Sequence, residues 1–405
     1  MKIDMAIKMV FMAFLAMNMV RTSLCKDFYV TDYGAIPDGK TENSEAFLKA
    51  WEESCAYNGS AKFIVPKGTF FLYPVTFAGP CYNHSSPKVV IQGTLNAPSD
   101  LKQFPATRMA WIEFRVLSKL VVNGGGIING QGHQVWPCVP RCGAGRKSNK
   151  MPINILFSQV HDTIITDIHS VDSKGVHLKI QRSLNVTVHN IDITAPGNSP
   201  NTDGIYSSLT NFLTLTNINI KTGDDCIAIG QGCTNVFIAN IHCGPGHGIS
   251  VGSLGAHENE SNVAGLVVKN CTVSNTTNGV RIKTWGGSKP GKASNITFEN
   301  ILMKNVSNPI IIDQGYCQKY KRCSNAPSLI QLENIKYKNI RGTSFDEVGV
   351  SFECSKVVPC KGVSLEDIDL KYVGDDEAVT SITSSCTFAL GKTMGFQNPN
   401  PCLSS

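Results

Sequence analysis

The sequence predicts an all-β protein, a single-stranded, right-handed parallel β-helix with a short N-terminal capping helix. Between about residues 160 and 315, a short alternating apolar segment that ends in asparagine recurs, and each copy is followed by a second short apolar segment. Self-similarity at a fixed period, with one supersecondary unit per copy, is typical of solenoids. The N-terminal helix is predicted from an amphipathic stretch that precedes the repeats.

The repeats have a period of about 22 residues that lengthens to about 30 in later copies. The first segments are Val186–Ile191, Leu213–Ile218, Val236–Ile241, Leu266–Cys271 and Ile296–Ile301, and the second segments begin at Ile205, Ile227, Ile249, Val280 and Ile310. Apolar residues are expected to stack in files inside the coils, and the asparagines to form hydrogen-bonded stacks at a coil corner. A two-sheet sandwich is the alternative, but the fixed asparagine period and the scarcity of hairpin dipeptides argue against it.

Both ends of the repeat region carry features that suit solenoid ends. Residues 42–57 follow possible caps at Thr41 and Asn43 and present one apolar helical face, formed by Phe47, Ala50, Trp51, Ser54 and Cys55. We expect this helix to cover the open N-terminal coil. Near the other end, Cys386 and Cys402 are expected to fasten the tail.

The first 25 residues have the pattern of a signal peptide. Lys2 and Lys8 precede an apolar run, Met9–Val20, and a Ser23-x-Cys25 end suits signal peptidase. We therefore expect a leader over 1–25 and one β-helix catalytic domain over 26–405. The apolar run is too short to span a bilayer, so an exported, soluble protein without a membrane partner is predicted.

Composition agrees with export and narrows the partners. Fifteen cysteines, one of them in the leader, predict disulfides formed in an oxidising compartment. Zinc is the competing interpretation, but no paired C-x-x-C and no histidine cluster occurs, so no metal or cofactor is expected. The net charge of +6 is compatible with an anionic partner, whereas the lack of a Lys/Arg-rich run argues against nucleic acid. Eight glycosylation sequons also agree with export: Asn58, Asn83, Asn185, Asn259, Asn270, Asn275, Asn295 and Asn305.

Aligning the coils brings chemistry-bearing residues to one position. Asp203, Asp225 and His247 each lie two residues before the second segment of their coil, and Asp224 adds a third carboxylate. Strands in neighbouring coils are about 4.8 Å apart, so these groups are expected along one ridge. Interacting carboxylates separate their pKa values into an acid and a base, which is what glycoside hydrolysis requires.

Two cations are predicted at one end of the same groove. Arg281 and Lys283 share a parity and so project from one face, and their equivalents in the preceding coils are small: Ala228, Gly230, Ser250 and Gly252. Strict alternation assigns Asp224 to the face of these cations and turns Asp225 toward the side of Ile227. Both carboxylates reach the groove only if the chain bends at Gly223–Asp225.

A turn-forming role is the non-functional alternative for each polar residue. An aspartate before a glycine, such as Asp203 before Gly204, is by itself more often a turn former than a catalyst. His247 is likewise flanked by glycines. Adjacent carboxylates at a packed corner cost stability, however, and the shared coil position of all these residues favours a functional site.

Four motifs in chain order resemble those of glycoside hydrolase family 28, the polygalacturonases. They are Asn201-Thr202-Asp203-Gly204, Gly223-Asp224-Asp225-Cys226, Gly246-His247-Gly248 and Arg281-Ile282-Lys283. The likeness extends from about Asp32 to Cys402, looks closest to plant members, and includes Tyr316 at the place of a substrate-binding tyrosine. It implies a pectin lyase-like solenoid.

The resemblance implies inverting hydrolysis of the α-1,4 galacturonosyl linkages of pectin. Asp224 would be the general acid, Asp203 and Asp225 would position and deprotonate water, and His247 would tune the acid. Arg281 and Lys283 would bind the galacturonate carboxylate, and Asn201 and Tyr316 would help to hold sugar. No metal is implied. Homogalacturonan as substrate, a monomer, and secretion to the plant cell wall are the matching expectations.

The mode of cutting stays open between exo and endo. Exo action is favoured by Ser199-Pro200 and Arg341–Ser344, which resemble exo-acting plant members, and by two candidate walls, Gly132–Lys150 and the long intervals after His247. An endo-acting enzyme and a non-catalytic pectin-binding β-helix are the alternatives. A calcium-dependent pectate lyase shares the β-helix, but the motifs resemble the hydrolase instead.

Family resemblance and short loop length suggest three disulfides, Cys226–Cys243, Cys354–Cys360 and Cys386–Cys402. Three further pairings are expected on weaker grounds: Cys55–Cys81, Cys138–Cys142 and Cys317–Cys323. This scheme leaves Cys233 and Cys271 as buried thiols.

Overall fold

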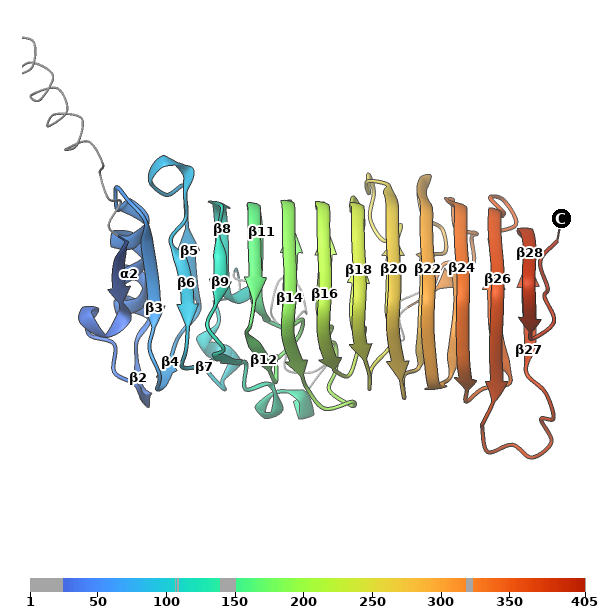
Figure 1. Ribbon diagram of the computed structural model, residues 1–405, viewed down its shortest axis with the longest axis horizontal. Coiled ribbons are helices and arrows are strands. Elements are labelled where there is room, and N and C mark those ends of the chain that lie inside the picture. Colours follow the sequence, from blue (N-terminus) through green and yellow to red (C-terminus); the bar gives the residue numbers. More distant parts are fainter. Residues whose placement is uncertain (1–24, 106, 108, 139–150, 318–322, 405) are drawn as a thin grey trace, which may run out of the picture.

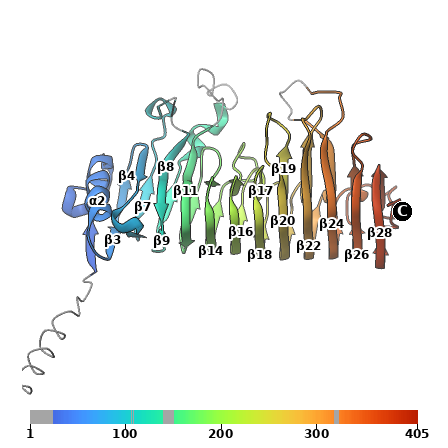
Figure 2. The same cartoon turned by 90° about the horizontal axis from the view of Figure 1, so that it is seen from above.

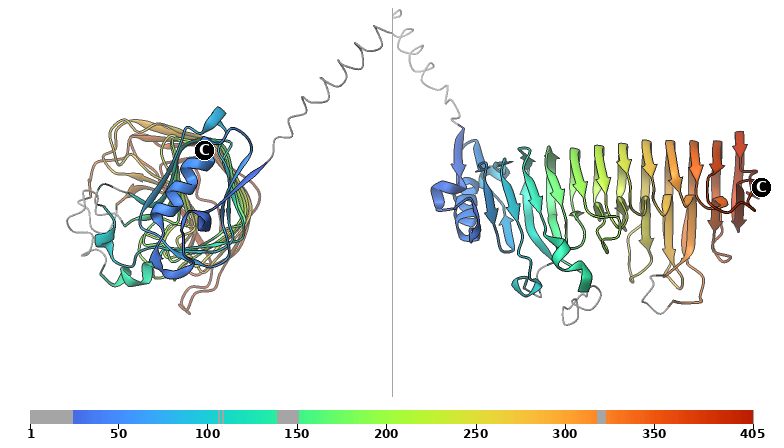
Figure 3. Two further views of the ribbon diagram at one scale, coloured as in Figure 1. Left: turned by 90° about the vertical axis from the view of Figure 1, so that its left-hand side faces the viewer. Right: turned by 90° about the horizontal axis from the view of Figure 1, so that it is seen from below.

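The computed structural model describes residues 25–105, 107, 109–138, 151–317 and 323–404. Its strands are stacked in successive coils along one long axis, with the N-terminal coils at one end and the C-terminal coils at the other (Figure 1). Viewed along that axis, the coils superimpose around a common interior (Figure 3). The predicted right-handed parallel β-helix is confirmed. No helix in the described part of the chain is long and apolar enough to cross a membrane.

Two long ladders of parallel strands form the walls. The ladder that later carries the site, here called the groove ladder, contains β5 (Val75–Ala78), β8 (Ala110–Ser118), β11 (Ile153–Thr166), β13 (Leu178–Gln181), β15 (Ile205–Ser208), β17 (Ile227–Ile229), β19 (Ile249–Leu254), β21 (Asn278–Trp285), β23 (Asn308–Tyr316), β25 (Val348–Glu353) and β27 (Thr383–Thr387). The second, here called the long ladder, contains β1 (Lys26–Tyr29), β3 (Ala61–Val65), β6 (Lys88–Ile91), β9 (Val121–Asn123), part of β11, β14 (Leu184–Thr194), β16 (Asn211–Lys221), β18 (Thr234–Cys243), β20 (Val263–Ser274), β22 (Gly291–Val306), β24 (Ile330–Ser344), β26 (Cys360–Tyr372) and β28 (Ala389–Asn398).

A third, shorter ladder closes the early coils before it merges into β14. Its strands are β2 (Asp38–Glu42), β4 (Thr69–Phe71), β7 (Thr94–Asn96), β10 (Ile127–Asn129) and β12 (His169–Val171). The helical elements are η1 (Val30–Tyr33), α2 (Ser44–Ala56), η2 (Tyr82–His84), η3 (Leu101–Gln103), η4 (Gly132–Gln134) and η5 (Trp136–Cys138).

The predicted asparagine stacks bend the long strands. Asn217, Asn240 and their counterparts have φ near +55°, a left-handed conformation that asparagine tolerates better than most residues. The amide of Asn240 donates to Asn217 at 3.1 Å, and that of Asn300 to Asn270 at 3.1 Å. Each bend therefore turns the chain around the core while its polar side chain bonds to the neighbouring coil.

Helix α2 covers the N-terminal coil, as expected (Figures 1 and 3). Its apolar face is buried, and Trp51 packs at ring-centroid distances of 5.8 Å from Phe63, 5.1 Å from Phe77 and 6.1 Å from Phe114. The Trp51 indole N–H donates to the carbonyl of Ala78 at 3.0 Å. The helix thus closes a core that would otherwise open to solvent.

Five of the expected disulfides are present, and both expected thiols are free and buried. The bridges are Cys55–Cys81, Cys226–Cys243, Cys317–Cys323, Cys354–Cys360 and Cys386–Cys402, and the thiols are Cys233 and Cys271. The sixth pairing involves Cys142, which lies outside the described residues. The expected leader over 1–25 also lies outside them, apart from Cys25.

Loops project from one side of the solenoid in two groups (Figure 2). One group lies near β8 and β11, and the other lies around β19, β22 and β24. The coils of β15 and β17 carry short connections between these groups. The fold therefore leaves its middle coils less covered than the coils on either side.

We expect Trp51→Ala to lower the free energy of unfolding by about 3–5 kcal/mol, because the change removes a buried indole from the aromatic cluster. Thermal and denaturant unfolding followed by circular dichroism would measure this. Glu52→Ala, on the exposed face of the same helix, is the matched control and should have an effect within about 0.5 kcal/mol. Equal stabilities of the two variants would contradict the capping role.

Candidate active site

The floor of the candidate site is the middle of the groove ladder. Ile205, Ile227 and Ile249 point inward and are at most 1 % exposed, so the residues that follow them point outward. The outward file runs through Tyr206, Ala228, Ser250 and Arg281, which are in register. The small residues predicted to form a groove floor therefore lie beside the predicted cation.

The carboxylates and the histidine enter from the bends just before these strands. The amide of Gly204 donates to the carbonyl of Asp225 at 2.9 Å, and that of Cys226 donates to Gly248 at 2.8 Å. These hydrogen bonds place Asp203, Asp225 and His247 at equivalent positions of three successive coils, which confirms the predicted register.

The turn that carries Asp224 and Asp225 is held by buried hydroxyl groups. The amide of Gly223 donates to the Thr202 hydroxyl at 2.9 Å, and this hydroxyl is also 2.7 Å from that of Ser199. A Cβ on Gly223 would lie 1.9 Å from the Ser199 carbonyl oxygen, so only glycine fits there. The bend that the sequence required at Gly223–Asp225 therefore exists.

The prediction that Asp224 and Asp225 follow the alternation of a strand, with Asp224 on the face of the cations, is wrong. The segment Thr222–Cys226 is not in a strand, so the alternation does not apply to it. Asp225, not Asp224, contacts the cations. It is 2 % exposed, and it accepts hydrogen bonds from Arg281 Nη2 at 2.9 Å and from Lys283 Nζ at 2.6 Å. Two cations make this buried carboxylate the electrostatically compensated member of the group.

Ser250 is a site residue whose role the sequence did not reveal. Its hydroxyl donates to Asp225 Oδ1 at 2.9 Å and accepts a hydrogen bond from Arg281 Nε at 3.2 Å. Sequence reasoning placed Ser250 on the floor only as a small residue. Its position one strand before Arg281 in the same outward file was the available signal.

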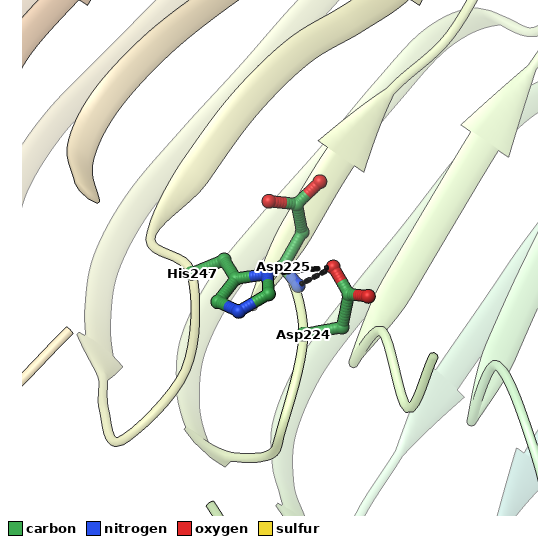
Figure 4. Close-up of side chains that lie close together, drawn as sticks. All are labelled: Asp224, Asp225 and His247. Atoms are coloured by element: carbon green, nitrogen blue, oxygen red, sulfur yellow. Dashed lines mark hydrogen bonds and ion pairs between the residues drawn. The ribbon is translucent and has the colours of Figure 1, made fainter. Parts of the chain in front are cut away.

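Asp224 faces His247 instead of the cations. Its Oδ1 lies 3.0 Å from His247 Nδ1 and accepts the Asp225 amide at 2.8 Å (Figure 4). The Asp224 and His247 side chains keep exposed fractions of 25 % and 39 %. Of the two adjacent carboxylates, Asp224 is thus the one with access to solvent and to a ligand.

The carboxylates have pKa values that diverge. Burial raises the pKa of Asp203 well above its usual range, and the charges of Asp224 and Asp225 raise it further. Burial also acts to raise the pKa of Asp224, but its hydrogen bond to His247 and the charges of His247 and Lys283 lower it overall. In the ligand-free site, burial and like charges therefore favour the protonated form of Asp203 more than that of Asp224.

Tyr316 lies against the cations, and Asn201 lies at the edge of the site. The Tyr316 ring centroid is 5.2 Å from Lys283 Nζ and 5.9 Å from Arg281 Cζ, within range of cation–π attraction. Asn201 is exposed, with φ of +55°, in the turn that leads to Asp203. The structure thus places Tyr316 beside both cations. Asn201 lies two residues before Asp203, at the exposed edge of the site.

A metal ion does not fit the acidic group well. Asp224, Asp225 and His247 offer ligand atoms within 4.8 Å of one another. Both oxygens of Asp225, however, already accept hydrogen bonds from Arg281 and Lys283, whose charges repel a divalent cation. The arrangement suits proton transfer beside an anionic ligand better than metal chemistry.

We expect Asp203→Asn to melt at a higher temperature than the wild type at neutral pH. Because its folded-state pKa is raised, the ionisation of Asp203 destabilises the fold increasingly as pH rises from about 4 through that raised pKa. The advantage of the variant should therefore shrink as pH falls toward 4. Melting curves across pH test this, with exposed Asp346→Asn as control. A pH-independent difference would contradict it.

Comparison with known proteins identifies the family of this chain. The profile of Glycosyl hydrolases family 28 matches residues 55–388. A polygalacturonase of Gossypium barbadense is 43 % identical over 373 residues, 92 % of this chain and 89 % of the relative. An exopolygalacturonase of Platanus acerifolia is 42 % identical, covering 88 % and 93 % respectively.

The solved structure of a family 28 exopolygalacturonase of Yersinia enterocolitica superposes with a TM-score of 0.73 at 16 % identity, over 94 % of this chain and 77 % of that one. At that identity, the superposition supports the fold alone. The family profile and the plant relatives carry the assignment, and they cover the same coils that bear the carboxylates and the cations. The chain belongs to glycosyl hydrolase family 28 and is a glycoside hydrolase.

Proposed function

We propose that this chain is a polygalacturonase that hydrolyses the α-1,4 linkages of homogalacturonan with inversion. The observation that carries the proposal is the pairing of three neighbouring carboxylates with two nearly buried cations in one groove. Carboxylates supply acid and base, and cations suit a substrate that bears a carboxylate on each sugar. The plant relatives named polygalacturonase support the same substrate.

In this mechanism Asp224 donates its proton to the glycosidic oxygen as the bond to the anomeric carbon breaks. A water molecule attacks that carbon from the opposite face and gives its proton to Asp203, whose raised pKa suits a base. Asp225, held by the two cations, orients the water. The products are two saturated sugars.

The lowered pKa of Asp224 in the free enzyme has to rise for this role, and Asp203, whose pKa is raised, has to be ionised before it can accept the proton of water. A bound galacturonate brings a negative charge and displaces water near Asp224, and both effects disfavour the ionised acid. His247 Nδ1 lies 3.0 Å from Asp224 Oδ1, within hydrogen-bonding distance of the acid. This histidine therefore acts by tuning Asp224.

The substrate carboxylate is bound by the N–H groups of Arg281 and Lys283 that Asp225 does not occupy. Arginine has five such groups and lysine three, so each cation can bind Asp225 and a ligand together. Tyr316, beside both cations, and Asn201, at the exposed turn, hold sugar hydroxyls. Secretion to the plant cell wall, where this substrate occurs, completes the proposal, and the protein works as a monomer.

Removal of single galacturonic acid units from the non-reducing end is the preferred mode. One candidate wall begins at η4 and η5, which are tied to the coil before β13: the Trp136 indole donates to Ser173 at 3.2 Å, and Lys174 Nζ donates to the Gly130 carbonyl. Residues 139–150 of this wall lie outside the described part. The second group of loops projects on the other side of the middle coils (Figure 2).

Asp224→Asn is expected to lower hydrolysis of polygalacturonate by about 10²–10⁴-fold, because it removes the proton donor while keeping the shape. An aryl galacturonide whose leaving group needs no proton should restore activity to this variant. Asp203→Asn, the matched carboxylate control, should not be restored. If the aryl galacturonide restored activity to Asp203→Asn instead, Asp203 would be the acid and Asp224 the base. Near-wild-type turnover of Asp224→Asn would disprove the assignment of Asp224 as the acid.

Exo action predicts a slow fall in viscosity and galacturonic acid as the early product. Viscosity and reducing ends should be followed together during digestion of polygalacturonate. A rapid viscosity drop with early oligomers would mean endo action. Products that absorb in the ultraviolet would mean lyase chemistry, and binding without any product would mean a pectin-binding protein.

A further inference from the structure

The two outward files of the groove ladder carry cations on both sides of the carboxylates. From β11 to β25, all within the described residues, these cations are Arg281 and Lys283 on the C-terminal side and Lys179 on the N-terminal side. Lys179 is in register with Tyr206, and Tyr206 leads through Ala228 and Ser250 to Arg281. Lys179 thus belongs to the same outward file as Arg281.

Lys179 is held over an aromatic ring that lies on the groove floor. Its Nζ is 5.2 Å from the Tyr206 ring centroid. Tyr206 extends along the floor toward Gly230, where an added Cβ would lie 2.6 Å from the Tyr206 hydroxyl oxygen. A side chain at residue 230 would therefore displace the ring that supports Lys179.

Tyr206 also lies close enough to Asp203 to feel its charge. It follows Asp203 by three residues, and burial together with the charge of Asp203 raises the pKa of Tyr206 to about 12. Tyr206 therefore stays a neutral phenol that offers a ring face and a hydroxyl donor. The pair combines a cation, an aromatic surface and a hydroxyl, which are the groups that bind an acidic sugar.

On the C-terminal side of Arg281 and Lys283, the charged outward residues of the groove ladder are acidic. Lys283 is in register with Asp313, and Asp313 with Glu353. Acidic residues there disfavour a further uronate on the C-terminal side. The cationic stretch is thus short, and it is centred on the carboxylates instead of extending along the groove.

We propose that Lys179, supported by Tyr206, binds the carboxylate of the galacturonate on the N-terminal side of the cleaved bond, opposite the unit bound by Arg281 and Lys283. This inference rests on the proposed function. The Arg281 and Lys283 side chains reach back to Asp225, which lies one coil beyond Tyr206, so the two cationic positions are separated by roughly 10 Å or two strand spacings. A disaccharide of galacturonic acid can span that gap.

The proposal makes Lys179 a specificity residue. A free carboxylate gains a charge-assisted bond from Lys179, whereas a methyl ester at the same unit does not. The enzyme should therefore discriminate against esterification on the N-terminal side of the cleaved bond. Loss of Lys179 should remove this discrimination without removing the catalytic groups.

The test uses the full chain carrying Asp224→Asn, so that digalacturonate binds without being cut. Calorimetry should show that adding Lys179→Met weakens digalacturonate binding about tenfold or more, and that it removes the preference over one of the two singly methyl-esterified analogues while leaving the preference over the other. Tyr206→Leu should have a smaller effect in the same direction, because it removes only the support.

The chain contains a matched control on the long ladder. Lys269 Nζ lies 5.1 Å from the Phe237 ring in the same cation-over-ring geometry, away from the groove. Lys269→Met and Phe237→Leu should leave binding and ester preference unchanged, and melting curves should show that all variants fold. An unchanged affinity and ester preference in Lys179→Met would overturn the proposal. A wild-type enzyme that binds digalacturonate but hydrolyses no galacturonide would instead refute the proposed function and leave the Lys179 site standing.

Discussion

The structure depends on in-register parallel stacking of successive coils. Backbone hydrogen bonds between neighbouring strands hold equivalent residues of each coil about one strand spacing apart. The interior is consequently a set of files such as Ile205, Ile227 and Ile249, all nearly inaccessible to solvent. The same rule aligns polar residues outside, so a linear order of residues becomes a linear order of charges along the groove.

The carboxylates of the site differ in how far their negative charges are compensated by neighbouring groups. Asp225 accepts hydrogen bonds from two cations and a serine, and its charge is compensated. Within the described residues Asp203 makes no ion pair, and its pKa is raised because burial and the charges of two other carboxylates outweigh the charge of Lys283. Glycoside hydrolysis needs carboxylates of unequal pKa, and the proposed mechanism requires substrate binding to shift the proton from Asp203, which favours it in the free site, to Asp224. Holding like charges together lowers stability, and the disulfide-braced coils around the site offset this effect.

The Cys226–Cys243 bridge illustrates how the scaffold supports this cost. Cys226 directly follows Asp225 and is joined to the far end of β18 in the same coil. The Thr202 hydroxyl holds the other side of the turn through the amide of Gly223. The carboxylates therefore sit on a turn that is fixed from both sides, which keeps like charges close together without letting the turn open.

Loops flank the middle coils that carry the candidate site (Figure 2). Two groups of insertions between strands project from the same side of the stacked coils and flank the middle coils (Figure 2). The anchoring of η4 and η5 by Trp136 shows that one insertion is packed onto the coils. The insertions thus flank the candidate site, whereas the site residues themselves lie on the coils.

The sequence by itself determined the coils, the asparagine corners, the capping helix and the shared position of Asp203, Asp225 and His247. It could do so because a solenoid converts a sequence period directly into a spatial position. Only the tertiary structure decided which carboxylate meets the cations and that Ser250 joins them. Side chains alternate between faces inside a strand, but not in the bend at Thr222–Cys226. The long side chains of Arg281 and Lys283 also reach across coils to Asp225, and no local sequence pattern encodes that contact.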